Sequence, residues 1–360
     1  MHLVGSSISY WFSIIIEEAI EDYVTKVQAE NSKEVTSKIY FEKAVEHRIS
    51  CSENSHFNGT METLPYLYPF TIEYNIILAS AWFTIWANIG KHHLNSHPHH
   101  ITSEIKEDED GQSEVVYKSS VSVNVDCHAS NRGLFGGLFI LLLILITIVV
   151  FFSTIKLKDF SHIGVHIYTG QIALLTIVCL VIIPLAYRQT RQLHVVNIHH
   201  FSNSFTKMDD VLVLIPLPFY LLHYSLAIKA EVAKICHHFD FERFFLIFIY
   251  ICSILQVVIQ SPFIVDGIRR CSNSKELRFR KPGRELITFL LILNISLWIL
   301  NTFELKSVDK HQSPQQYFGK FNWMIISHTT LPLMLLYRFH SSVCLSDIWK
   351  SAYEKDEGIH

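Results

Sequence analysis

Eight stretches of the chain are poor in charged residues and rich in apolar ones, and polar segments separate them. They cover residues 3–16, 70–90, 134–155, 163–187, 211–230, 244–266, 286–303 and 321–339. Residues 134–155 alone hold 22 successive positions without Asp, Glu, Lys or Arg. A helix of that length is about 33 Å long, which is enough to cross a hydrocarbon core about 30 Å thick. The pattern predicts an all-α polytopic membrane protein with about eight transmembrane helices.

The first stretch is the least regular of the eight. It is short for a membrane span, and it lacks the basic start and small-residue cleavage site of a secretory signal peptide. We expect a helix that runs on into the amphipathic residues 17–22.

Composition supports a membrane class and excludes several others. The 360 residues are 49% hydrophobic and only 18% charged, whereas charged residues make up about a quarter of an ordinary soluble chain. Disordered, collagen-like and disulfide-scaffold proteins are therefore excluded. There is neither a Walker or dinucleotide fingerprint nor a basic arm for nucleic acid. The seven cysteines form no CxxC pair, and at most one disulfide, between Cys51 and Cys236, is compatible with the topology below.

Basic residues set the expected orientation, since Lys and Arg gather in cytoplasmic loops. The loop 267–285 carries seven of them, and Arg188 and Arg191 follow the fourth helix. Alternation of eight helices places both loops, and the C-terminus, on the same side. We expect that side to be cytoplasmic. The segments expected outside are 25–68, 156–162, 231–243 and 304–320. The sequon at Asn58 then lies outside, where glycosylation is feasible.

The segment 91–132 between the second and third helices is rich in histidine and acid. It holds His92, His93, His97, His99 and His100, followed by Glu107-Asp108-Glu109-Asp110. Such a segment could bind a divalent metal or sense cytosolic pH, or it could be a solvated linker without either role. The sequence alone leaves these alternatives open.

Ionisable and amide groups within the predicted spans are the candidate functional residues, because burying them in hydrocarbon is costly unless they face a partner or water. Glu73 and His328 both exchange protons at accessible pH, so they suit a proton path. Amides in the spans could hold a short water chain between Glu73 and His328, or they could simply join helices by hydrogen bonds. These amides are Gln171, Gln256, Gln260, Asn294 and Asn301. Gln256 and Gln260 share one helix face, four residues apart. Asp209 and Asp210 are expected to cap the start of the fifth helix.

Five segments of the sequence resemble the otopetrin family of proton-selective channels. They are HLVGSSISYWFSIIIEE, PFTIEYNIILASAWFTIWANIG, LQVVIQSPFIVDGIRR, KPGRELITFLLILNISLWIL and ISHTTLPLMLLYRFHSSVCLSDIWKSAY. The resemblance implies a homodimeric subunit of twelve helices in two similar halves, of which this chain is similar to the C-terminal two-thirds. On that basis the domains are a partial N-terminal half at 1–90, a cytosolic linker at 91–132, a six-helix half at 133–345 and a cytosolic tail at 346–360.

The resemblance also assigns individual residues. His2, Glu73 and His328 match the family's histidine, glutamate and histidine on its fifth, sixth and twelfth helices. Asn301 lies near a position where some relatives carry an acid, and Gln171 stands where the family pattern has glutamate. An amide does not titrate in the accessible range, so that exchange puts conduction in doubt.

The implied function is a plasma-membrane channel that conducts protons inward when the outside is acidic, with lipids and a second subunit as partners and no cofactor. An alternative is a non-conducting paralogue that modulates a full-length relative by dimerising with it. An intramembrane acyltransferase using His328 is a third class, but no paired catalytic motif supports an enzyme.

Overall fold

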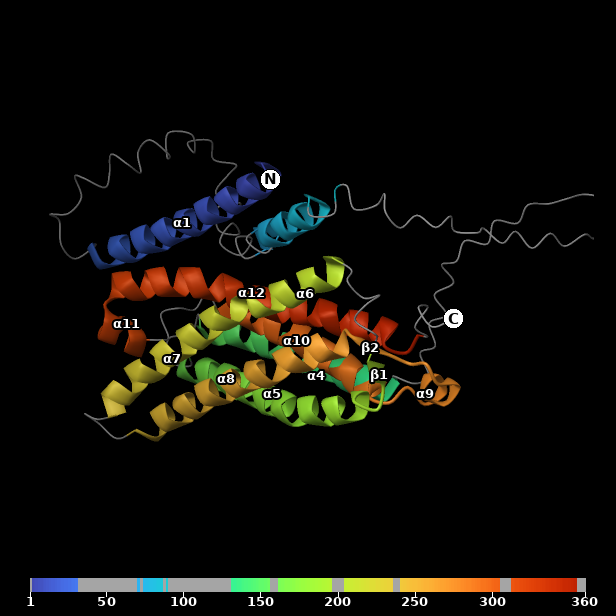
Figure 1. Ribbon diagram of the computed structural model, residues 1–360. Coiled ribbons are helices and arrows are strands. Elements are labelled where there is room, and N and C mark those ends of the chain that lie inside the picture. Colours follow the sequence, from blue (N-terminus) through green and yellow to red (C-terminus); the bar gives the residue numbers. More distant parts are fainter. Residues whose placement is uncertain are drawn as a thin grey trace, which may run out of the picture.

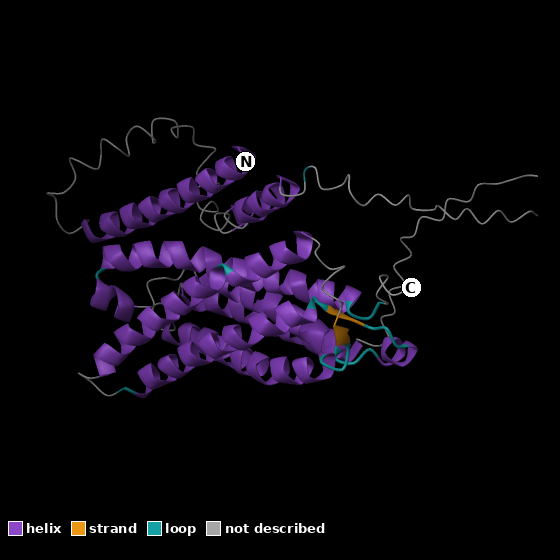
Figure 2. Cartoon of the chain, viewed as in Figure 1, coloured by secondary structure: helices purple, strands orange, loops and turns teal. Residues whose placement is uncertain are grey.

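A computed structural model describes residues 2–31, 70–71, 74–86, 89, 131–155, 161–195, 204–235, 240–304 and 312–354. Figure 1 shows these residues as a bundle of helices, and Figure 2 shows how little other regular structure they contain. The helices are α1 (His2–Asn31), a short helix Tyr74–Trp86, α4 (Asn131–Ile155), α5 (Ser161–Thr190), α6 (Ser204–Leu214), α7 (Pro216–Ile235), α8 (Phe241–Gly267), α9 (Lys275–Arg280), α10 (Arg284–Glu304), α11 (Gln312–Phe318) and α12 (Lys320–Ser351). Two short strands, β1 (His194–Val195) and β2 (Arg270–Cys271), complete them.

The predicted fold class is confirmed. Six of the eight predicted stretches lie on one helix each over their described residues, the stretch 211–230 is divided between α6 and α7 at Ile215, and the stretch 70–90 is helical except at Ile89 over its described residues. Among the described residues, six helices are long and apolar enough to cross a membrane. The short helix Tyr74–Trp86 falls below that length. α12 is long, but its buried Arg338 and the polar residues along it keep it below that hydropathy.

The outside of the bundle is apolar, which is the reverse of a soluble protein. On α4, Phe135 is 69% exposed and Val149 is 65% exposed, and no aqueous surface would favour so many bare aliphatic and aromatic groups. A hydrocarbon surrounding accounts for them, because lipid tails solvate such side chains as well as a protein core does.

Glycines bring α4 and α10 into close contact. A Cβ atom placed on Gly133 would lie 2.0 Å from the backbone oxygen of Glu285, and one on Gly137 would lie 2.6 Å from Ile292 Cδ1. The two glycines are four residues apart, so they lie on the same face of α4. This is the small-residue spacing that lets membrane helices approach closely. This contact holds α10, which carries two of the predicted amides, in place.

One end of the bundle is tied together by contacts among three loops. β1 pairs with β2 antiparallel, which joins the segment after α5 to the segment after α8. The Ser272 N–H donates to the Glu354 carbonyl, and the Tyr353 hydroxyl donates to the Pro282 carbonyl at 2.8 Å. Burial raises the pKa of Tyr353, so this donor keeps its proton. The two basic loops and the end of α12 therefore lie at the same end, as the orientation argument requires.

α1 and the short helix Tyr74–Trp86 lie together along one flank of the bundle (Figure 1). Where they meet α6 they leave an apolar groove of about 550 Å³, lined by residues such as Ile8, Phe83 and Val211. The helices α4, α5, α7, α8, α10 and α12 instead share one continuous core. The site described below lies in that six-helix part.

Candidate functional site

Polar side chains inside the six-helix part form two separate groups at different depths. The first is an amide ladder, made of Gln256 and Gln260 on α8 and Asn294 on α10. The second is a cavity nearer the end of the bundle that lies away from the two strands. The sequence predicted amides at both places without separating them.

The amide ladder is a continuous chain of hydrogen bonds. Gln256 donates from Nε2 to Gln260 Oε1 at 2.6 Å, and Gln260 donates from Nε2 to Asn294 Oδ1 at 2.9 Å. Asn294 then donates from Nδ2 to the Leu290 carbonyl of its own helix at 2.9 Å. The three side chains are at most 1% exposed. Helical spacing explains the start of the ladder, since residues four apart lie on one face.

Arg338 on α12 ends the ladder with a fixed positive charge. Its Nη1 donates to Gln256 Oε1 at 2.6 Å, and its Nη2 donates to the Tyr220 hydroxyl. The side chain is 1% exposed, and the Tyr220 and Tyr337 rings lie 5.3 Å and 5.9 Å from its guanidinium carbon. No carboxylate in the described part of the chain forms an ion pair with it. A guanidinium stays charged at every accessible pH, so this charge is permanent.

Sequence reasoning did not single out Arg338 as a functional residue, because it stands one residue before the end of the last predicted span, where a basic residue is expected to mark the cytoplasmic side. The structure continues α12 to Ser351, so Arg338 lies well inside the bundle. The signal was present, because an arginine inside a membrane-spanning segment needs a partner.

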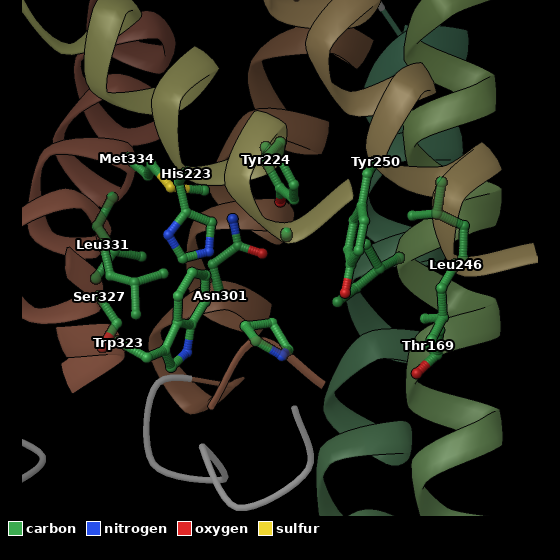
Figure 3. A pocket seen from close by; sticks show the side chains of 15 residues that line it. Thr169, His223, Tyr224, Leu246, Tyr250, Asn301, Trp323, Ser327, Leu331 and Met334 are labelled. Atoms are coloured by element: carbon green, nitrogen blue, oxygen red, sulfur yellow. The ribbon is translucent and has the colours of Figure 1, made fainter. Parts of the chain in front are cut away.

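The second group lines a cavity of about 70 Å³ between α5, α7, α8, α10 and α12. A water molecule takes about 30 Å³ in the liquid, so the cavity has room for at least two. Its polar lining residues are Thr169, His223, Tyr224, Tyr250, Asn301 and Ser327. Figure 3 shows His223, Asn301 and Trp323 on one wall, and Tyr250, Leu246 and Thr169 on the opposite one.

His223 is the histidine that lines this cavity, and sequence reasoning did not single it out. Its Nδ1 lies 2.8 Å from Thr330 Oγ1, and its ring lies 5.3 Å from the Trp323 ring, centroid to centroid. The hydroxyl and the indole fix the ring in one orientation. An imidazole beside water can accept and release protons near neutral pH, so the cavity can pass a proton between water and a side chain.

The predicted residues therefore divide among several places. Asn301 lines the cavity, whereas Asn294, two turns away on the same stripe of α10, belongs to the ladder. His328 is buried next to cavity residue Ser327, but its Nδ1 lies 2.9 Å from the Met324 carbonyl of its own helix. Gln171 is partly buried on α5 and joins neither group.

Other predicted residues lie elsewhere. His2 is exposed at the start of α1, with Nδ1 3.4 Å from Ser6 Oγ. Glu73, Asn58, Cys51 and Cys236, and the linker histidines fall outside the described residues. The capping role expected of Asp209 and Asp210 is wrong. α6 begins at Ser204, so both acids lie in its second turn, where Asp210 pairs with Arg269.

Comparison with known proteins gives one family. The family model described as Otopetrin matches residues 25–339. The chain is 27% identical to "Proton channel OtopLc" of Drosophila melanogaster over 98% of this chain and 23% of the relative. It is 22% identical to "Proton channel OTOP3" of Homo sapiens over 79% of this chain and 51% of the relative. The chain thus spans between about a quarter and a half of the length of these two relatives.

Proposed function

The chain belongs to the otopetrin family, and from that premise we propose that it is a proton channel subunit that carries hydrogen ions inward when the outside is acidic. The observation that carries the proposal is the polar cavity with its histidine, which lies at a different depth from the amide ladder inside the same apolar bundle. Relatives named proton channels support the same permeant ion for this chain.

The cavity is the entry for protons in this proposal. His223 takes a proton from water in the cavity, and Asn301 and Ser327 hold that water by hydrogen bonds. His328, one residue further along α12, and Glu73, which matches a family glutamate, are further relay positions. Gln171 and His2 are pore-facing positions by resemblance alone. None of these steps needs a cofactor, because each moves a proton between side chains and water.

The amide ladder is the barrier. Its members neither titrate nor have free space for water, and the charge of Arg338 repels an approaching cation. Two unit charges several ångströms apart interact by a few kcal/mol at an effective dielectric constant of about 20. A repulsion of that size is enough to stop conduction at rest. Acid outside would then open the route by protonating groups in the cavity and on its outer side. This would weaken the hydrogen bonds of the ladder.

We propose that the protein lies in the plasma membrane. The strand-bearing end of the bundle and the C-terminus then face the cytosol. The basic loops support this orientation. On α9, the ring of Phe279 is 92% exposed between Arg278 and Arg280. An apolar ring flanked by basic residues suits an anionic inner leaflet.

The test is whole-cell recording during a drop in external pH, with surface expression verified by labelling. We expect an inward current that follows the proton gradient and is lost in a variant with His223 and His328 both changed to Gln. Surface-expressed protein without any acid-evoked current would contradict conduction by this chain alone.

A second candidate function is modulation of a full-length relative, and Gln171 favours it, because an amide that does not titrate stands where the family pattern has glutamate. The partner in either case is a second otopetrin chain, identical or full-length. Co-expression separates the two functions. Silence of the chain alone, with an altered current in the pair, supports the modulator, whereas unaltered currents in the pair contradict it.

A further inference from the structure

We propose that Asp209, His340 and Cys344 form a zinc-binding site between α6 and α12, at the strand-bearing end of the bundle. The proposal is independent of proton conduction. It concerns a cluster that neither the cavity nor the ladder uses.

The three side chains offer one ligand atom each, and these atoms all lie within 4.8 Å of one another. Asp209 Oδ1 and His340 Nε2 are 3.5 Å apart. Two donors about 2.0–2.1 Å from one tetrahedral zinc ion lie about 3.3 Å from each other. The observed separation therefore needs only a small adjustment for both atoms to reach the same ion.

Local structure explains why the ligands meet. His340 and Cys344 are four residues apart on α12, so they lie on one face, one turn above the other. Asp209 faces them from α6, which packs against α12. The two α12 residues are 5% and 0% exposed, and the Asp209 side chain is 15% exposed. The carboxylate thus gives the site its access to solvent.

His340 provides an independent sign of a missing ligand. Its Nε2 atom is buried, and no hydrogen bond reaches it from any residue that the structure describes. A buried polar nitrogen without a hydrogen bond is costly, whereas coordination to a metal would satisfy it. The Asp209 oxygen, 3.5 Å away, is within ion-pair distance of a protonated imidazole, and beside a neutral imidazole it is placed to be a second ligand.

The chemistry of the donors selects zinc. A thiolate, an imidazole and a carboxylate are the three ligand types that Zn²⁺ takes in proteins, and oxygen-only metals such as Mg²⁺ and Ca²⁺ do not use sulfur. Cys344 would bind as the thiolate and release its proton to water when the ion arrives. One carboxylate, one thiolate and one neutral imidazole balance the double charge of Zn²⁺, so the occupied site is neutral. The fourth position is left for water.

Binding there would fasten the middle of α6 to the C-terminal third of α12. Zinc from the cytosol would reach the site if the orientation proposed above holds. The bound ion would resist any movement of α12 relative to α6.

The test uses the purified full chain in detergent, titrated with Co²⁺ as a coloured substitute and with Zn²⁺ in competition. We expect a thiolate-to-cobalt absorption band in the unaltered protein, absent from Cys344→Ser. His340→Gln and Asp209→Asn should each weaken Zn²⁺ binding at least tenfold. Because zinc binds the folded state, it should also raise the unfolding temperature of the unaltered protein and not that of Cys344→Ser.

Matched controls distinguish this site from other ligands in the chain. Cys252→Ser removes a buried thiol on α8, Cys127→Ser removes the thiol closest in sequence to the linker histidines, and His194→Gln removes an exposed imidazole. All three should keep the band. A band that is absent from the unaltered protein, or that survives in Cys344→Ser, overturns the proposal. If Cys344→Ser does not fold, undiminished zinc affinity in His340→Gln overturns it equally.

Discussion

The cavity and the amide ladder use the same kinds of polar residue in opposite ways. In the cavity, Asn301 and His223 border empty space with room for water. In the ladder, Asn294 and Gln260 are saturated by one another and by Arg338, with no space between them. In the proposed function, a proton is handed over in the first setting and stopped in the second. The difference shows that packing around a polar side chain, as well as its chemical type, decides what the side chain can do.

The largest expected effect comes from removing the charge that separates the two regions. Arg338→Met should raise the resting proton flux at neutral external pH thirtyfold or more, because the repulsion lost is worth about 2–4 kcal/mol at an effective dielectric constant near 20. The measurement is a pH-sensitive dye inside liposomes that contain the chain, alone or paired with a full-length relative.

Arg338→Lys is the control, since it keeps the charge at this position and should keep the block. Equal fluxes in the two variants, with both folded by thermal unfolding, would mean that the charge of Arg338 does not form the barrier. The ladder would then have no electrostatic role.

The second comparison exchanges the same residue type in each region. Asn294→Leu should lower the free energy of unfolding by about 1–3 kcal/mol, because it leaves the Gln260 amide buried without its acceptor. Asn301→Leu should cost less than about 1 kcal/mol, since water in the cavity can serve the groups that Asn301 leaves. Denaturant unfolding in detergent measures both. Equal losses would show that the cavity is as dry as the ladder.

A third, smaller effect tests whether the empty volume of the cavity is needed for proton flux. Ala227 lines the cavity, whereas Ala230 is fully buried on the same helix and is not part of the cavity wall. Ala227→Val should fit without loss of stability and lower the proton flux about threefold by displacing water. Ala230→Val should instead destabilise the fold by about 1–3 kcal/mol through overpacking. If Ala227→Val leaves the flux unchanged, the cavity is not on the proton route.

The sequence predicts the fold more fully than the site, and the hydrocarbon core is the reason. A span in this bundle keeps its backbone hydrogen bonds within a helix and is largely apolar, so the helices are visible as charge-poor stretches. Their ends are less visible, since helices continue beyond the membrane: α7 runs to Ile235, into the segment predicted as an outer loop. The pairing of β1 with β2 has no sequence signal, because each strand is two residues long.

For the site, periodicity predicts only what lies on one helix. The spacing of Gln256 and Gln260 indicates a shared face, and the structure confirms that they are hydrogen bonded. Their contacts with Asn294 and Arg338 depend on how three helices pack, which no spacing within one helix reveals. For the same reason sequence reasoning could not tell that Asn294 and Asn301, on one stripe of α10, belong to different groups.

The smallest expected effect concerns the cavity histidine. His223→Gln should lower the acid-evoked proton flux two- to threefold, because the amide preserves the side chain's hydrogen-bonding capacity toward Thr330 but cannot take up a proton. The loss is modest because water in the cavity can carry protons past one missing relay group. His194→Gln, at an exposed imidazole on β1, is the control and should leave the flux unchanged. The liposome assay measures all three proteins. A His223→Gln flux equal to that of the unaltered chain would leave the cavity as a water-filled space without a titratable relay, and the contrast with the ladder would then rest on hydration alone.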